Sequence, residues 1–239
     1  KVWKDNIVYR NGLGKGGSPQ VFTIDSAMPP TPVPDRKKHS AIAVRVATAP
    51  VPDGEITPSE WPGDLQTLDR EPSRYPVGGS PTLVKFAYDD QCLYVGATVT
   101  LFAPAQIGTN SVWGKDDGIE LCIVGKTQDA QPTVFVIRGF AGGAFQSVTD
   151  AGAPAEAAAR LGKDVRFAAS QTKSWNKTLK GWRGEWAIPF AALGLKPEPG
   201  LKVAFNMGAF YSEFGEWHCW EGTRAENWRL DQAGTLQFK

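Results

Sequence analysis

The chain has 239 residues, 41% of them hydrophobic, and a formal net charge of +1. This composition supports a sizeable core and excludes wholesale disorder. The balanced charge gives no electrostatic reason to expect nucleic acid as a partner. We expect no membrane partner either, because no apolar run approaches the roughly 20 residues that a spanning helix needs.

The N-terminal region predicts an extension rather than part of the main module. It has no initiator Met and no signal-peptide shape, so we expect the chain to be a piece of something longer. Short apolar pieces at 7–9 and 21–24 predict strands, and a Pro-rich stretch, Met28 to Lys38, is typical of a linker. We therefore predict an extension and linker over residues 1–38, with the tail of a preceding module as one interpretation, and a single module over residues 39–239.

Beyond the linker, short segments of alternating apolar and polar residues predict strands separated by turns. The predicted strands cover residues 41–46, 82–88, 93–99, 119–123, 133–138, 165–169, 182–188, 201–210 and 234–238, and short helical pieces cover 153–161 and 190–195. Many short strands with little helix are typical of an all-β fold. We predict an antiparallel two-sheet β-sandwich of the jelly-roll or immunoglobulin type with one or two short helices.

The stretch that begins at Trp113 is the most informative about function. In the strand that follows, Ile119 and Leu121 fall on one face, and Glu120 and Cys122 fall on the other. An aromatic ring beside carboxylates suits sugar recognition, in which the ring covers C–H surface and the carboxylates accept hydroxyl hydrogen bonds. It also suits catalysis by a carboxylate pair. A Trp packed in a loop beside turn-capping acids is the structural alternative.

Nine Trp residues exceed what a domain of this size normally buries, so we expect some of them to face a ligand. In the cluster 217–221, a strand would point half of the side chains inward, and we predict a core or rim position for Trp220. The cysteines (Cys92, Cys122 and Cys219) form neither a zinc pattern nor a disulfide framework. We expect buried thiols at the first two, and a single bridge stays open as an alternative.

Four sequence motifs follow one another between residues 52 and 230. They are Pro52-Asp53-Gly54-Glu55 with Trp61, Tyr88 to Val95, Trp113 to Leu121, and Trp186 to Leu195 with the ending Asn227-Trp228-Arg229-Leu230. Together, over about residues 41–239, they resemble the family 9 carbohydrate-binding modules. The resemblance implies a two-sheet sandwich stabilised by calcium. It also implies a non-catalytic C-terminal piece of a larger polysaccharide-active protein, with a covalently linked catalytic module and an extracellular or periplasmic location.

The resemblance also implies a binding site. In the sugar-binding members two Trp clamp a sugar unit, and Trp113 and Trp228 stand at the matching positions, while Glu120 matches the sugar-contacting carboxylate. We predict that the ligand-binding residues are Trp113, Trp228, Glu120, Asp117, Arg138, Asn227 and Arg229. The partner would be a monosaccharide, an oligosaccharide or a polysaccharide end.

Three positions depart from the pattern of the sugar binders. Leu101, Val136 and Gly208 stand near positions where the family carries Asp, Arg and Gln. Half of the polar network is therefore replaced, which leaves the recognised glycan and chain end open. For the implied calcium, the candidate carboxylates are Asp89, Asp90, Asp116 and Asp117, because this cation takes six to eight oxygen ligands. Capping of turns is the alternative role for each of them.

The sequence therefore predicts a carbohydrate-binding module that targets an attached enzyme to polysaccharide. One alternative is a structural or interaction sandwich of the same fold that binds no sugar. Another is a glycosidase that uses Asp117 and either Glu120 or Glu221 as acid and base. A third is a haem-binding sandwich, for which Met207 and His218 are the candidate ligands.

Overall fold

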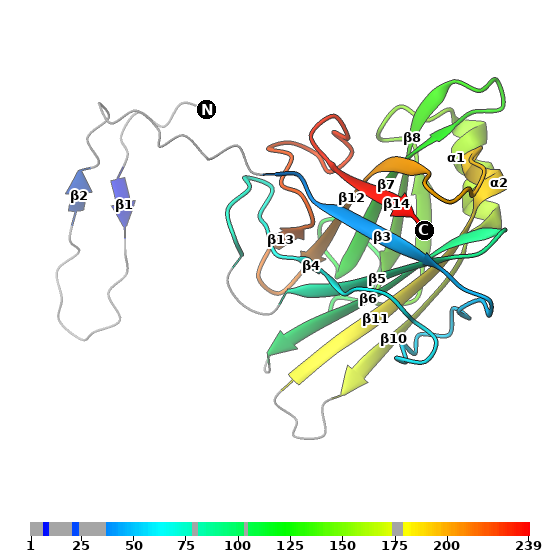
Figure 1. Cartoon of the computed structure of the whole chain (residues 1–239). Coiled ribbons are helices and arrows are strands. Elements are labelled where there is room, and N and C mark those ends of the chain that lie inside the picture. Colours follow the sequence, from blue (N-terminus) through cyan, green and yellow to red (C-terminus); the bar gives the residue numbers. More distant parts are fainter. Residues whose placement is uncertain (1–6, 10–20, 24–36, 78–80, 103–104, 174–178) are drawn as a thin grey trace. The chain divides into compact units, whose positions relative to one another are not determined.

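The structure is a computed structural model that describes residues 7–9, 21–23, 37–77, 81–102, 105–173 and 179–239 (Figure 1). Contacts within the chain divide it into two units, Lys1–Lys37 and Lys38–Lys239. In the first unit, β1 (Ile7–Tyr9) pairs antiparallel with β2 (Val21–Thr23). Nearly all of the predicted linker lies outside the described residues.

The described part of the second unit contains twelve strands and two short helices. They are β3 (Ser40–Arg45), β4 (Gln66–Leu68), β5 (Thr82–Tyr88), β6 (Cys92–Phe102), β7 (Gly118–Lys126), β8 (Pro132–Phe140), β9 (Phe145–Val148), α1 (Ala155–Asp164), β10 (Arg166–Lys173), β11 (Leu179–Pro189), α2 (Phe190–Leu193), β12 (Lys202–Tyr211), β13 (Glu216–Cys219) and β14 (Gly234–Phe238). Each predicted strand and helical piece of this unit is confirmed, with shifted ends. The short strands β4, β9 and β13 were not predicted.

These strands form one continuous mixed sheet. Its order is β10-β11-β6-β5-β3-β14-β12-β7-β8-β9, with β4 paired to β5 and β13 paired to β12. The sheet curls until its two ends approach each other, and the rings of Phe145 in β9 and Phe167 in β10 lie 6.3 Å apart. The result is nearly barrel-shaped (Figure 1).

Strand β3 accounts for the main difference from the predicted antiparallel two-sheet sandwich. It runs parallel to both β14 and β5, and so joins the two halves of the sheet. The alternation of apolar residues shows which face of a strand is buried but not the direction of its neighbours. A parallel pair needs a long connection, which the segment 46–81 provides between β3 and β5.

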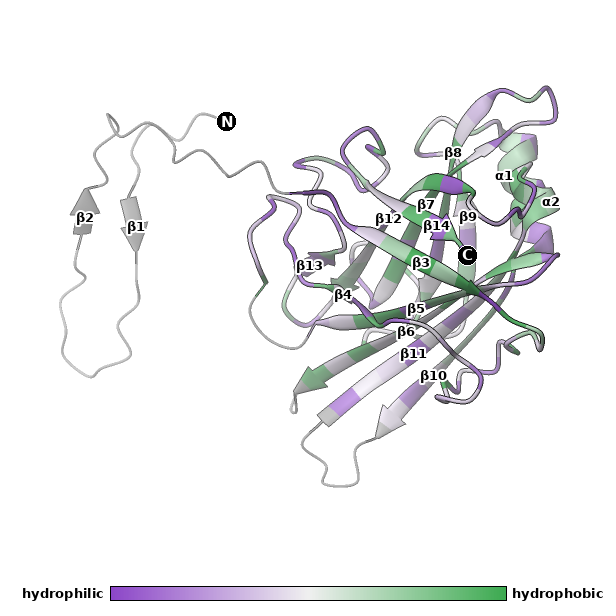
Figure 2. Ribbon diagram, in the orientation of Figure 1, coloured by the Kyte–Doolittle hydropathy of each residue, from purple (hydrophilic) through white to green (hydrophobic). Residues whose placement is uncertain are grey.

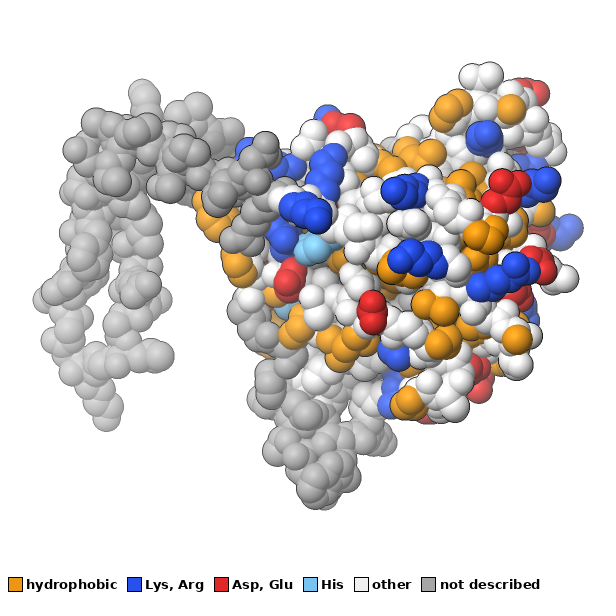
Figure 3. Space-filling model, viewed as in Figure 1, with side chains coloured by type: hydrophobic (Ala, Val, Ile, Leu, Met, Phe, Trp, Pro, Cys, Tyr) orange, Lys and Arg blue, Asp and Glu red, His pale blue; other side chains and the backbone are white. Residues whose placement is uncertain are grey.

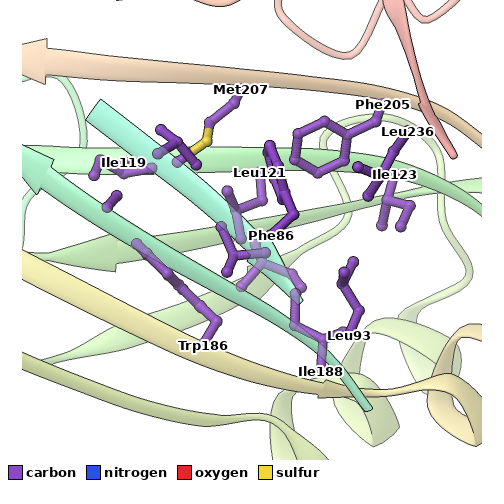
Figure 4. Packing of buried hydrophobic residues seen from close by; sticks show 14 of the residues in the cluster. Phe86, Leu93, Ile119, Leu121, Ile123, Trp186, Ile188, Phe205, Met207 and Leu236 are labelled. Atoms are coloured by element: carbon purple, nitrogen blue, oxygen red, sulfur yellow. The ribbon is translucent and has the colours of Figure 1, made fainter. Parts of the chain in front are cut away.

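The two halves of the sheet enclose one hydrophobic core (Figure 4). Phe86 and Trp186 enter it from β5 and β11, and Leu121 and Phe205 enter it from β7 and β12. All four side chains are at most 2% exposed. Figure 2 shows the apolar residues concentrated along the strands that face this core.

Strand β7 confirms the predicted division of its faces. Leu121 lies in the main core, whereas Cys122 belongs to a separate cluster on the opposite face. That outer face is also covered, because Leu230 and Ala233 of the C-terminal segment pack on it together with Cys122. The Glu120 side chain, on the same outer face, is therefore buried rather than open to solvent.

The loop at 53–61, before β4, is fixed to β11 by a second buried carboxylate. Glu185 of β11 accepts hydrogen bonds from the backbone N–H groups of Asp53 (3.1 Å) and Gly54 (2.6 Å). It also accepts one from the indole Nε1 of Trp61 at 3.0 Å. Gly54 has a φ of +90°, a conformation that glycine adopts without strain. The sequence motif around Asp53 and Trp61 thus has a structural role, because it fixes this loop to β11.

Candidate functional site

The site is built on the outer face of four neighbouring strands. The pairing register aligns Arg138 of β8, Glu120 of β7, Gly208 of β12 and Cys219 of β13 in one row. Residues that are paired across antiparallel strands point to the same face of a sheet. A carboxylate, a guanidinium and a thiol therefore share one surface, with a position that lacks a side chain between them.

Gly208 provides the space for a side chain that comes from elsewhere. A Cβ atom at this position would lie 2.1 Å from Nδ2 of Asn227. The Asn227 amide instead lies over the glycine, beside the Glu120 carboxylate, whose pKa it helps to lower. At Gly208, where the sequence departs from the sugar binders, an amide from the C-terminal segment therefore occupies the floor of the site.

Asn206 holds the segment that carries Asn227 and Trp228. It lies two residues before Gly208 on the same face of β12 and is fully buried. Its Nδ2 donates to the carbonyl oxygens of Glu221 (3.1 Å) and Asn227 (3.2 Å), and its Oδ1 accepts from the Glu221 N–H at 3.0 Å. One amide side chain thus fixes both ends of residues 221–227.

Arg138 supports two of the predicted ligand-binding residues at once. Its Nε donates to Glu120 Oε2 at 2.8 Å, and its Nη2 donates to Asp150 Oδ2 at 2.6 Å. Its guanidinium carbon lies 4.5 Å from the centre of the Trp113 ring, within the range of a cation–π contact. Burial raises the pKa of Glu120, and the positive charge of Arg138 opposes that shift.

A cavity of about 290 Å³ opens over this floor. Its lining consists of Pro72, Trp113, Glu120, Trp217, Cys219, Ala225, Glu226, Asn227 and Trp228. Its volume lies at the small end of the range of roughly 300–1,000 Å³ for small-molecule sites. The structure brings together four of the predicted residues here, namely Trp113, Trp228, Glu120 and Asn227.

The described tryptophans fall into two groups, those that are fully buried and those that line this cavity. Among the seven that the structure describes, Trp61, Trp182, Trp186 and Trp220 are buried to 1% exposure or less, which confirms the core position predicted for Trp220. The other three are half-buried, and all of them line the cavity. The surplus of Trp in the composition thus corresponds to three Trp that line one cavity, and their ligand role stays a prediction.

Trp217 is the largest of the five lining residues that were not predicted, the others being Pro72, Cys219, Ala225 and Glu226. Its ring centre lies 5.0 Å from that of Trp113 and 4.8 Å from that of Phe210, so it braces Trp113 from the side. Alternation along β13 places Trp217 and Cys219 opposite His218 and Trp220. That signal was present in the sequence, but it required knowing that β13 is a strand.

Three predicted ligand-binding residues do not line the cavity. Asp117 is fully buried, and its Oδ2 accepts from the Gly108 N–H at 2.8 Å and from the Ser212 hydroxyl. Burial raises the pKa of Asp117. Arg138 lies behind Trp113, and Arg229 is exposed and paired with Asp231 at 3.2 Å. Ligand roles for these three residues stay predictions.

Leu101 and Val136, the other two departures from the pattern of the sugar binders, are buried apolar side chains. Leu101 lies in the main core, and Val136 packs beside Cys122 on the outer face. Cys92, Cys122 and Cys219 are all buried and free, so no disulfide joins them.

The carboxylates considered for calcium are engaged in shaping turns. Asp89 accepts from the backbone of Gln91 (2.7 Å) and Cys92 (2.8 Å), and Asp116 accepts from the N–H of Val112 at 2.8 Å. In the part of the chain that the structure describes, no group of three or more His, Cys, Asp or Glu side chains is placed to hold a metal ion. Structural calcium held by these carboxylates together with backbone carbonyls stays a prediction.

The catalytic and haem alternatives gain no support from the geometry. The carboxylates that line the cavity are Glu120 and Glu226, whereas Asp117 and Glu221 lie outside its lining. Met207 is fully buried in the main core, which leaves it unavailable as a haem ligand.

Comparisons with known proteins identify the fold. No family model matches the chain, and no curated protein sequence matches it. Two solved structures of a family 9 carbohydrate-binding module from Caldicellulosiruptor kristjanssonii are similar to it. The complex with cellotriose has a TM-score of 0.57 at 17% identity, covering 84% of this chain and 94% of the other. The complex with glucose has a TM-score of 0.55 at 19% identity, covering 84% and 96%.

A third solved structure, of a Bacteroides uniformis protein with a proposed carbohydrate-binding role, has a TM-score of 0.57 at 16% identity and covers 85% of this chain and all of that one. The structure itself is a β-strand module with two short helices. More narrowly, the fold is that of the family 9 carbohydrate-binding modules, as the sequence resemblance predicted.

The described residues contain no helix that is long and apolar enough to cross a membrane. On the face that Figure 3 shows, Lys and Arg side chains are scattered among acidic and apolar ones.

Proposed function

We propose that this protein is a non-catalytic carbohydrate-binding module that holds a sugar unit in the cavity between Trp113 and Trp228. The observation that carries the proposal is a cavity lined by three half-buried Trp together with Glu120 and Asn227. The similar modules from Caldicellulosiruptor kristjanssonii, which were solved with cellotriose and glucose, support the same class of ligand.

The lining matches the two kinds of surface on a pyranose. The apolar C–H faces of the sugar pack on the indole rings, which are large, rigid and inexpensive to order. The Glu120 carboxylate accepts hydrogen bonds from hydroxyl groups, and bonds to a charged acceptor are stronger than neutral ones. The Asn227 amide can both donate and accept, so it can distinguish between orientations of the sugar hydroxyls beside Glu120.

In this proposal the module targets an attached catalytic module to polysaccharide. Weak contacts with one sugar unit raise the effective concentration of the linked enzyme at its substrate. An extracellular or periplasmic location goes with that role, because polysaccharides are found there.

Calorimetric titration with glucose, cellobiose and longer oligosaccharides tests the proposal. We expect Trp228→Ala to weaken binding by more than about tenfold while the melting temperature changes little, because this indole is half-buried and lines the cavity. Trp113→Ala should weaken binding similarly and cost more stability, since Trp113 packs on Phe140 and Trp217.

Leu65→Ala is the matched control, because it removes an exposed apolar side chain that does not line the cavity. We expect it to bind sugar as the wild type does. Absence of binding to every sugar, or normal binding by both Trp variants, would refute the proposal.

A further inference from the structure

A second cavity adjoins the first. It has a volume of about 320 Å³ and is lined by Glu71, Pro72, Val77, Glu216, Trp217 and His218. Pro72 and Trp217 line both cavities, so the indole of Trp217 is a wall between two compartments. A chain of sugar units that leaves the first cavity past this wall would enter the second.

The charged side chains that line the second cavity are both acidic. Glu71 and Glu216 are exposed, and no Lys or Arg is among the lining residues. His218 is only 4% exposed, and burial lowers its pKa despite the opposing charges of Glu216 and Glu71. The imidazole is therefore neutral near pH 7, and the lining carries the two negative charges of its carboxylates.

His218 also has an unused polar atom. Among the described residues its Nδ1 has no hydrogen-bond partner, while its Nε2 lies 3.8 Å from Glu216 Oε2. A buried polar atom without a partner costs free energy, and a rotation of the imidazole that turns Nδ1 toward the cavity would let a ligand hydroxyl recover it. The second cavity thus combines an acidic mouth, an apolar wall and a buried imidazole that lacks a partner.

We propose that this second cavity binds the next unit of the same oligosaccharide and selects a unit that carries a free amino group. The inference rests on the proposed function and specifies its ligand. The ammonium group of such a unit lies between Glu71 and Glu216, the ring packs on Trp217, and a hydroxyl pairs with His218.

The size of the preference follows from the exposure of the carboxylates. Exposed ion pairs are individually weak and are screened by salt. Two of them together should favour the amino sugar over its neutral counterpart by about three- to tenfold at low ionic strength. This preference should fall when sodium chloride is raised to about 0.5 M.

The test is calorimetric titration at pH 6 and low salt with three β-1,4-linked disaccharides. Cellobiose is the neutral reference, the glucosamine disaccharide carries charged amino groups, and the N-acetylglucosamine disaccharide is neutral but bulkier. We expect the glucosamine disaccharide to bind the wild type about three- to tenfold more tightly than cellobiose. In the double variant Glu71→Gln with Glu216→Gln, that preference should disappear while the affinity for cellobiose is retained.

Equal affinity of the wild type for cellobiose and the glucosamine disaccharide would overturn the inference and leave the proposed function intact. A preference that survives in the double variant would overturn it too, because the selection would then belong to Glu120 and Glu226 in the first cavity. Failure of every sugar to bind, the three disaccharides included, would overturn both proposals. Both substituted side chains are exposed, so the double variant should fold normally, which its melting curve checks.

Discussion

Two buried carboxylates, Glu185 in β11 and Glu120 in β7, occupy opposite halves of the sheet and differ in what surrounds them. Each lies in the middle of a strand and is at most 2% exposed, and burial raises the pKa of both. Glu185 accepts three hydrogen bonds from the loop at 53–61. Glu120 accepts from Arg138 at 2.8 Å and from the Cys122 thiol at 3.8 Å, and it lines a cavity.

The comparison shows that burial and a raised pKa do not by themselves mark a binding residue. At Glu185 the chain supplies the donors, so the carboxylate stabilises a loop. At Glu120 the chain supplies the Arg138 guanidinium and the weakly donating Cys122 thiol, and the cavity leaves room for donors from a ligand. The distinction lies in the neighbouring groups and in the adjacent empty volume.

The largest expected effect is a loss of stability at Glu185. Glu185→Ala leaves the N–H groups of Asp53 and Gly54 and the Trp61 indole without their acceptor. We expect the free energy of unfolding to fall by about 3 kcal/mol, since each unsatisfied buried donor costs roughly 1 kcal/mol or more. Urea denaturation measures this change. Glu55→Ala, which removes only the exposed pair with Arg183, is the control and should cost less than about 0.5 kcal/mol. Equal losses in the two variants would contradict the anchoring role of Glu185.

Gly208→Ala should damage the cavity that contains Glu120. The added Cβ would meet Asn227 Nδ2 at 2.1 Å, so the amide must leave the floor of the cavity. Since the displaced atom is the end of a side chain, we expect a stability loss of only about 1 kcal/mol, but a loss of sugar affinity of about 2 kcal/mol. Titration and urea denaturation of the same sample separate the two effects. Unchanged affinity would show that the position of Asn227 does not matter for binding.

Glu120→Gln removes the charge and nearly preserves the shape. We expect sugar affinity to fall by about 1.4 kcal/mol, or tenfold, because a charge-assisted hydrogen bond becomes a neutral one. Arg138 keeps its ion pair with Asp150, which limits the loss of folding stability. The same substitution at Glu185 should leave sugar affinity unchanged. If Glu185→Gln weakened binding as much as Glu120→Gln, the functional distinction between the two carboxylates would fail.

The pH dependence of stability should carry opposite signs at Glu185 and at Glu221. The folded-state pKa of Glu185 is raised by burial, so its contribution to stability is present below the ordinary pKa and is lost as pH rises through the folded-state pKa. For Glu221, burial alone would raise the pKa, but hydrogen bonds from His39 lower it. Its contribution is therefore present above the ordinary pKa and is lost as pH falls through the folded-state pKa.

Urea denaturation between pH 3 and 7 of the wild type, Glu185→Gln and Glu221→Gln measures these slopes. We expect differences of about 1 kcal/mol across that range. The stability of the wild type relative to Glu185→Gln should fall as pH rises, and its stability relative to Glu221→Gln should rise. Slopes of the same sign would contradict the assigned directions.

The smallest expected effect is that of metal removal. Because the described carboxylates do not form a metal-binding group, we expect EDTA to change the melting temperature by less than about 1 °C. A larger fall that added calcium reverses would confirm the structural calcium that the family resemblance implies. It would also place the ion among ligands other than clustered carboxylates, such as backbone carbonyls.

The sequence predicted the parts of the site that depend on local pattern. Alternation in β7 correctly separated Glu120 from the core, and the number of Trp indicated a set that faces a cavity. The support from Arg138 was not predictable, because it depends on the register between β7 and β8. The place of Asn227 over Gly208 depends on how the C-terminal segment folds back, which no local pattern records. The parallel direction of β3 was also missed, because no local pattern records which strands pair with it.

The parallel pairing of β3 with β14 gives the module a particular resistance to tension. The N–H of Thr235 donates to the carbonyl of His39 at one end of the pair, and the N–H of Arg45 donates to the carbonyl of Lys239 at the other. A pulling force applied through residues 39 and 239 would therefore slide the two strands past each other. In such a shear geometry the bonds between the strands bear the load together, whereas strands that are peeled apart lose their bonds one at a time.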